Sequence, residues 1–123
     1  MIGYIMLGTN DLDRSIDYYD ALLGEMGATR RTTTQRYAAW SFGEGRTVLS
    51  VTLPVDRKEA GPGNGSMVAL GVRSPEKVDA LYAKALELGG TSEGAPGYRG
   101  ETFYAGYFRD PDGNKLNFFC YSE

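Results

Sequence analysis

The feature that most constrains this chain is a pattern of apolar residues that occurs twice. Residues 5–8 (Ile-Met-Leu-Gly) are matched 63 residues later by residues 68–71 (Val-Ala-Leu-Gly). The same spacing relates three further pairs in a helical segment: Tyr19 and Tyr82, Leu23 and Leu86, Gly27 and Gly90. We interpret the pattern as an internal repeat, in which each half needs a copy to bury its sheet. The alternative is chance similarity between two small αβ units.

The first copy is typical of one strand, one helix and three further strands. Side chains alternate between two faces over residues 2–9, which indicates a strand. Asn10 or Asp11 then provides an N-cap, apolar residues recur at helical spacing as far as Met26, and Gly27 ends the helix. Strands are predicted at residues 28–34, 36–42 and 46–53. Residues 1–53 are therefore predicted to form a βαβββ module.

A linker rich in glycine and proline, residues 54–65, precedes the second copy. A strand at residues 67–72 leads to Ser74 as N-cap, and Pro75 occupies a first helical turn that tolerates proline. Strands are predicted near residues 91–94, 101–109 and 114–121, with the turn Asp-Pro-Asp-Gly before the last one. In this last hairpin the spacing between the copies becomes 68 residues, which pairs Leu49 with Asn117. Residues 66–123 form the second predicted module.

Composition and charge limit the classes of function. The chain of 123 residues fits one domain, and its 41% hydrophobic and 24% charged residues are an ordinary globular balance. No apolar run reaches the roughly 20 residues that span a bilayer, and the N-terminus shows no signal peptide, so we expect a cytoplasmic protein without a membrane partner. A net charge of −3 gives nucleic acid no attraction. The basic cluster Arg30, Arg31 and Arg36 is either a solvated strand edge or a holder for an anionic ligand group.

The chain contains no histidine. This removes the commonest transition-metal ligand, the commonest general base, and both the Ser/His and the Cys/His nucleophilic devices. The single cysteine, Cys120, excludes an intrachain disulfide and is expected to be an inert buried thiol. No carboxylate can be placed as half of an acid–base pair, so catalytic residues stay unknown.

Two motifs resemble the signatures of one superfamily. Residues 11–19 (Asp-Leu-Asp-Arg-Ser-Ile-Asp-Tyr-Tyr) resemble the opening motif of the vicinal oxygen chelate superfamily, which includes glyoxalase I, bleomycin-resistance proteins and extradiol dioxygenases. Residues 108–116, with Asp-Pro-Asp-Gly-Asn, resemble its closing hairpin, and residues 94–99 resemble a loop of its bacterial lactoylglutathione-lyase-like branch. The resemblance covers nearly the whole chain. It implies an α+β fold of two βαβββ modules whose mixed sheets curl into an open cup, commonly completed in a homodimer.

The resemblance also implies four metal-ligand positions, on the first and last strands of each module. They fall on Tyr4, Leu49, Met67 and Asn117, where the family usually has His or Glu. Leucine cannot coordinate a metal, a thioether suits soft Cu(I), and a phenol stays protonated near neutral pH. Because a hard divalent cation needs several oxygen or nitrogen donors, we expect neither a metal nor another cofactor.

Strand alternation places these four positions on the face that lines the cup. Met6, Val51 and Phe119 share that face, and Trp40, Tyr104 and Tyr107 join them from neighbouring strands. The predicted ligand-binding set is Tyr4, Met6, Trp40, Leu49, Val51, Met67, Tyr104, Tyr107, Asn117 and Phe119. Apolar walls with a few polar groups are typical of small-molecule sites.

Three functions are compatible with this pattern. The leading hypothesis is a metal-independent protein that binds a small aromatic or antibiotic-like molecule and assembles as a homodimer. The second is a lyase or isomerase of the glyoxalase-like type, without a metal or with an atypical one, that uses a substrate loop around Tyr98 and Arg99. The third is a dimeric interaction module whose cup is filled by its own side chains.

Overall fold

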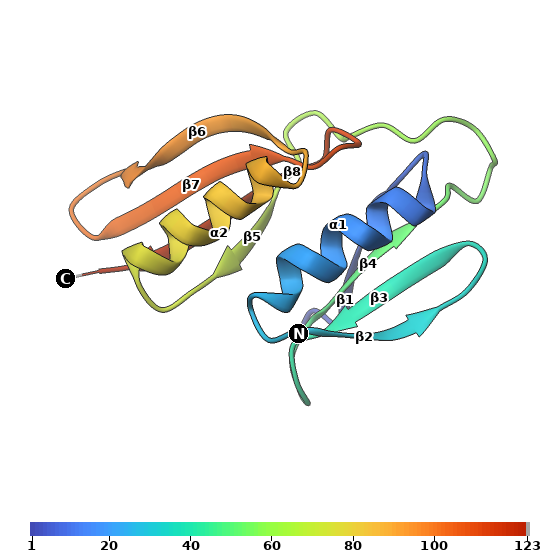
Figure 1. Cartoon of the computed structure of the whole chain (residues 1–123), viewed down its shortest axis with the longest axis horizontal. Coiled ribbons are helices and arrows are strands. Elements are labelled where there is room, and N and C mark those ends of the chain that lie inside the picture. The colour runs from blue at the N-terminus through green and yellow to red at the C-terminus, as the bar shows by residue number, and fades with distance from the viewer. Residues whose placement is uncertain (123) are drawn as a thin grey trace. The chain divides into compact units, whose positions relative to one another are not determined.

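The structure is a computed structural model that describes residues 1–122 and contains the βαβββ unit twice (Figure 1). The first copy comprises β1 (Tyr4–Gly8), α1 (Leu12–Gly24), β2 (Thr29–Thr33), β3 (Tyr37–Ser41) and β4 (Val48–Thr52). The second comprises β5 (Val68–Gly71), α2 (Pro75–Glu87), β6 (Thr91–Tyr98), β7 (Phe103–Arg109) and β8 (Lys115–Tyr121). The predicted α+β fold class and the order of elements are confirmed. The chain divides into two compact units, unit 1 (Met1–Pro62) and unit 2, which begins at Gly63.

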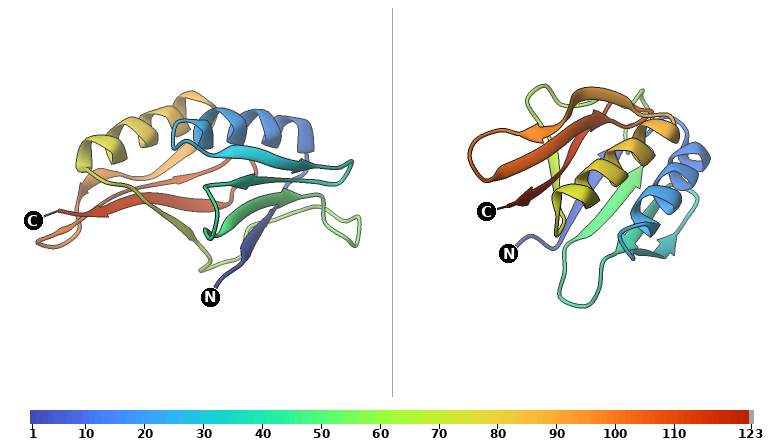
Figure 2. Two further views of the ribbon diagram at one scale, coloured as in Figure 1. Left: turned by 90° about the horizontal axis from the view of Figure 1, so that it is seen from below. Right: turned by 60° about the vertical axis from the view of Figure 1, so that its left-hand side comes forward.

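Each unit has one mixed sheet of four strands. The strand order is β1-β4-β3-β2 in unit 1 and β5-β8-β7-β6 in unit 2. The first and last strands of each copy are parallel neighbours, and the remaining pairs are antiparallel. Within each unit the helix covers one face of the sheet (Figure 2), and we call the opposite face the helix-free face. In the described residues 1–122 no helix is long and apolar enough to cross a membrane.

Unit 1 folds around the apolar side of α1. Asp11 caps the helix by accepting a hydrogen bond from the Arg14 backbone N–H at 3.1 Å, as one of the two predicted caps would. Tyr19 on the buried side of α1 contacts Trp40 of β3, with the ring centroids 5.6 Å apart. The indole Nε1 of Trp40 also donates to Asp20 Oδ1 at 2.8 Å. These contacts fix Trp40 on the helix side of the sheet.

The segment after β4 belongs to unit 1 as far as Ala60. The side-chain amide of Asn10 donates to the Ala60 carbonyl oxygen at 3.1 Å and accepts from the Ala60 N–H at 2.7 Å. A Cβ at Gly8 would lie 3.1 Å from the Ala60 Cβ, so the absence of a side chain lets this segment approach β1 closely. Much of the predicted linker is therefore bound to the first module.

Unit 2 repeats this plan around α2. Ser74 caps the helix by accepting from the Lys77 N–H at 3.2 Å, and Pro75 occupies the first turn, as predicted. Phe108 and Phe118 stack with centroids 5.2 Å apart on the helix side. Strand β6 corrects the prediction of a strand at residues 91–94, because it continues to Tyr98. Its pairing with β7 shifts register on both sides of Gly94, so glycine and proline interrupt the regular ladder without ending the strand.

The register of β4 differs from the predicted one. Ile5 pairs with Leu49 in unit 1, and the equivalent Val68 pairs with Leu116 in unit 2. The repeat therefore relates Leu49 to Leu116 and Ser50 to Asn117, a spacing of 67 residues rather than 68. The hairpin between β3 and β4 is one residue longer than the hairpin between β7 and β8, since Trp40 pairs with Leu49 whereas Phe108 pairs with Leu116. The pairing of Leu49 with Asn117 was wrong for this reason.

Candidate functional site

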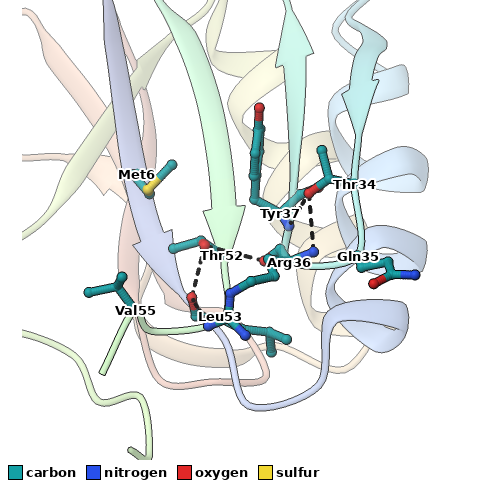
Figure 3. A pocket seen from close by; sticks show the side chains of 8 residues that line it. All are labelled: Met6, Thr34, Gln35, Arg36, Tyr37, Thr52, Leu53 and Val55. Carbon is teal, nitrogen blue, oxygen red and sulfur yellow. Dashed lines mark hydrogen bonds between the residues drawn. The ribbon is translucent and has the colours of Figure 1, made fainter. Parts of the chain in front are cut away.

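The helix-free face of unit 1 contains a pocket of about 680 Å³ (Figure 3). Met6 of β1 pairs with Ser50, and Tyr37 of β3 pairs with Thr52, so these side chains alternate with the helix-facing ones. The pocket is lined by Met6, by Thr34, Gln35, Arg36 and Tyr37 at the turn between β2 and β3, and by Thr52, Leu53 and Val55 at the end of β4. Its walls combine a thioether, a phenol ring and two aliphatic side chains with a few polar groups.

Two threonine hydroxyls fix the backbone around this pocket. The Thr34 Oγ1 accepts hydrogen bonds from the backbone N–H groups of Arg36 and Tyr37, each at 3.1 Å. The Thr52 hydroxyl lies 3.2 Å from the carbonyl oxygen of Arg36 and 2.9 Å from that of Leu53 (Figure 3). The turn and the end of β4 are thus tied together before any ligand arrives, which lowers the ordering cost of binding.

Arg36 bridges the two sides of the pocket rim. Its Nη2 donates to the carbonyl oxygen of Pro54 at 2.6 Å and to that of Leu53 at 3.3 Å. Within residues 1–122, no carboxylate forms an ion pair with the half-buried Arg36. Arg30 of the same basic cluster differs, since its Nε lies 3.2 Å from Asp20 Oδ1.

The predicted ligand-binding residues of unit 1 are divided between the two faces. Tyr4 and Met6 lie on the helix-free face, 66% and 46% exposed, and Met6 lines the pocket. Trp40, Leu49 and Val51 are buried on the opposite face and form the core beneath α1. The expectation that these three share a face with Tyr4 was wrong, because the additional hairpin residue shifts β4 by one position.

In unit 2, Tyr107, Asn117 and Phe119 lie on the helix-free face, as predicted. Tyr107 pairs with Asn117, and the Arg99 guanidinium and the Lys115 ammonium lie 5.4 and 5.6 Å from the Tyr107 ring centroid. Phe119 stacks on Phe103 with centroids 5.5 Å apart. Met67 immediately precedes β5 and is exposed.

Tyr104 corrects the prediction, because it faces α2. Its hydroxyl donates to Asp79 Oδ1 on that helix at 2.7 Å. This hydrogen bond, followed by desolvation and the charge of Asp79, raises the pKa of Tyr104 above its usual value. The prediction of Cys120 as a buried thiol is confirmed, and burial raises its pKa as well.

Asn117 is the polar side chain of greatest interest on the helix-free face of unit 2. It is 1% exposed, and its Oδ1 has no hydrogen-bond partner among the described residues. Burial of an unpaired amide oxygen costs about 1–3 kcal/mol. A ligand with an N–H or O–H donor could recover that energy.

The side chains at the four implied metal positions do not fit a hard divalent cation. The corrected register places Ser50 where Leu49 was expected, so that the donor set becomes Tyr4, Ser50, Met67 and Asn117. Two hydroxyls, a thioether and an amide supply no carboxylate and no imidazole. No three His, Cys, Asp or Glu side chains gather as a metal site would require anywhere in residues 1–122.

Sequence reasoning missed most of the pocket in unit 1. Tyr37 and Thr52 could have been identified from a correct register, because both alternate with buried positions. Arg36 was noted only as part of the basic cluster. Leu53 and Val55 follow the strand, where alternation no longer indicates the direction of a side chain.

Comparisons with known proteins agree with the fold. The sequence matches the Glyoxalase/Bleomycin resistance protein/Dioxygenase superfamily over residues 1–118. A lactoylglutathione lyase from Haemophilus influenzae is 33% identical over 130 residues, which cover 95% of this chain and 90% of that protein. A glyoxalase/bleomycin resistance protein from Albidiferax ferrireducens is 36% identical, with 98% of each chain covered and a TM-score of 0.89. A glyoxalase-related enzyme from Fulvimarina pelagi shares the fold at 22% identity, covering 98% of this chain and 87% of that one, with a TM-score of 0.80. This chain therefore belongs to the glyoxalase/bleomycin resistance protein/dioxygenase superfamily.

Proposed function

We propose that this protein binds a small, mainly apolar molecule in the pocket of unit 1 without the help of a metal ion. The observation that carries the proposal is the pocket itself, whose volume of about 680 Å³ lies in the range typical of small-molecule sites. Met6, Tyr37 and Leu53 provide apolar contact area, and the threonine hydrogen bonds hold the rim in place. The relative from Albidiferax ferrireducens is named a bleomycin resistance protein, which favours an aromatic or antibiotic-like ligand.

The neutral aromatic amine N-phenyl-1-naphthylamine is a suitable probe, because its fluorescence rises in an apolar environment. Replacing Met6→Asp puts a carboxylate on the apolar wall, and we expect the affinity for the probe to fall at least about tenfold, or 1.4 kcal/mol. Met6 is 46% exposed, so the substitution costs the fold little. Ile2→Asp is the matched control, since Ile2 is 63% exposed in the same unit and does not line the pocket. Equal loss of binding in both variants, or in neither, would contradict the proposal.

The absence of a metal requirement is tested separately. Protein purified without chelator should contain far less than one equivalent of Ni, Zn, Mn or Fe by elemental mass spectrometry, because the donor set lacks anionic and imidazole ligands. A stoichiometric metal that is lost in the Ser50→Ala and Asn117→Ala variants would refute this part of the proposal.

A lyase is the second candidate, and the specific observation in its favour is the lactoylglutathione lyase from Haemophilus influenzae. Turnover of a hemithioacetal by metal-free protein would support this candidate. No turnover with or without added Ni²⁺ or Zn²⁺, by protein that binds the aromatic probe, would favour the binding protein.

A further inference from the structure

Of the eight side chains that line the pocket of unit 1, Arg36 is the one that carries a charge. The other seven are apolar or neutral and polar, so nothing in the wall balances the guanidinium. No carboxylate of residues 1–122 pairs with it, whereas Asp20 neutralises Arg30 and Glu93 neutralises Arg109. An unbalanced cation beside apolar walls is unusual, because a partly desolvated charge is stabilised mainly by an opposite one.

The guanidinium is also held in a fixed position. A guanidinium has five N–H donors, and the carbonyl oxygens of Leu53 and Pro54 engage only its Nη2. The Nε and Nη1 donors make no hydrogen bond to residues 1–122. Two anchored bonds remove much of the rotamer entropy that an arginine loses when it binds an anion. The side chain therefore has both the donors and the preorganisation that recognition of a planar anion requires.

We propose that the pocket of unit 1 selects small amphipathic anions. An aromatic or aliphatic body packs against Met6 and Tyr37, while a carboxylate or sulfonate at its end binds the guanidinium of Arg36. The net charge of −3 does not prevent this, because salt screens long-range repulsion and the contact with Arg36 decides the affinity. This inference rests on the proposed function and adds the charge class of the ligand to it.

Two probes with the same ring skeleton test the charge preference. 8-Anilinonaphthalene-1-sulfonate carries a sulfonate, and N-phenyl-1-naphthylamine lacks it, so the ratio of their dissociation constants isolates the anionic group. We expect the native protein to bind the sulfonate about tenfold more tightly than the neutral probe at low salt. The ratio should decrease towards one as the salt concentration rises, since the added interaction is between charges.

Three variants assign that ratio to a residue. In Arg36→Gln the ratio should fall to about one while the neutral probe still binds. Arg36→Lys should keep a ratio well above one, because the charge remains. Arg31→Gln should keep the native ratio, since Arg31 is exposed on β2 outside the pocket.

The outcomes separate this inference from the function beneath it. An unchanged ratio in Arg36→Gln, or a native ratio near one at every salt concentration, overturns the anion preference while binding of the neutral probe preserves the proposed function. Failure of the neutral probe to bind, or its indifference to Met6→Asp, overturns the proposed function itself. Should Arg36→Gln unfold, the Arg36→Lys ratio and the salt dependence of the native protein decide the matter. A ratio near one in Arg36→Lys, or one that is independent of salt, overturns the inference.

Discussion

Replacing Asn117→Leu should stabilise the folded protein, although it removes a polar residue from a sheet. In the unfolded chain water solvates the Asn117 amide, but in the folded chain its Oδ1 is buried without a hydrogen-bond donor. Leucine branches at the same carbon and has no polar atom. The substitution removes the unpaired group as a whole and leaves no new one behind.

The magnitude follows from two opposing effects. Loss of the unpaired amide should be worth about 1–3 kcal/mol, and tight packing of the new methyl groups could return part of that gain. The neighbouring strand positions are Ala69 and Tyr107, and the small side chain of Ala69 leaves room on one side. We expect a net gain of about 1–2 kcal/mol, or roughly 4 °C per kcal/mol in the melting temperature of a chain of this size.

Urea unfolding followed by circular dichroism measures this change as a shift in midpoint at constant slope. Asn117→Asp is the matched control, because it preserves the shape and adds a charge. At pH 7 it should lower the free energy of unfolding by about 3 kcal/mol or more, with partial recovery in acid as the carboxyl is protonated. A loss of 1 kcal/mol or more in Asn117→Leu would show that the amide oxygen is paired in solution, and the reasoning would fail.

Three further predictions concern titration, reactivity and assembly. Because Asp79 raises the pKa of Tyr104, the neutral phenol stabilises the fold at pH values below its ordinary pKa of about 10, and this contribution disappears as the pH rises through the folded pKa; Asp79→Asn should let Tyr104 ionise earlier in an ultraviolet titration, and an unchanged titration would contradict the assignment. Buried Cys120 should react with a disulfide reagent no faster than the protein opens, so rapid labelling of folded protein at pH 8 would count against its burial. The exposed apolar residues Ile2, Tyr4, Met6 and Val55 of unit 1 favour self-association, and light scattering should give twice the mass of one chain, whereas a monomer at micromolar concentration would argue against it.

The elements of the fold could be predicted because their ends carry local chemistry. Asp11 and Ser74 cap the two helices, and Gly27, with φ of 82°, supplies the left-handed residue that ends the first. Strand β6 was predicted too short, because glycine and proline usually interrupt strands. Here they introduce bulges, since β7 still provides hydrogen-bonding partners as far as Tyr98.

The helix-free face was harder to predict, because it depends on an exact register. Alternation in β4 contains the right signal, since Ser50 and Thr52 are polar while Leu49 and Val51 are apolar. Alignment of the glycines in the two hairpins overruled that signal and hid the additional residue between Gly45 and Leu49. A shift of one residue moves every side chain of a strand to the other face.

The corrected register also explains how the chain can dispense with charged ligands at the implied metal positions. Ser50 and Asn117, on the last strands of their units, are nearly fully buried, whereas Tyr4 and Met67 near the first strands are exposed. A carboxylate at either buried position would require a cation beside it, because an unpaired buried charge costs several kcal/mol. A hydroxyl and an amide cost far less, so the fold can keep them whether or not an ion is bound. Affinity for a ligand must then come from contacts of the kind found in unit 1, where apolar walls surround a single fixed guanidinium.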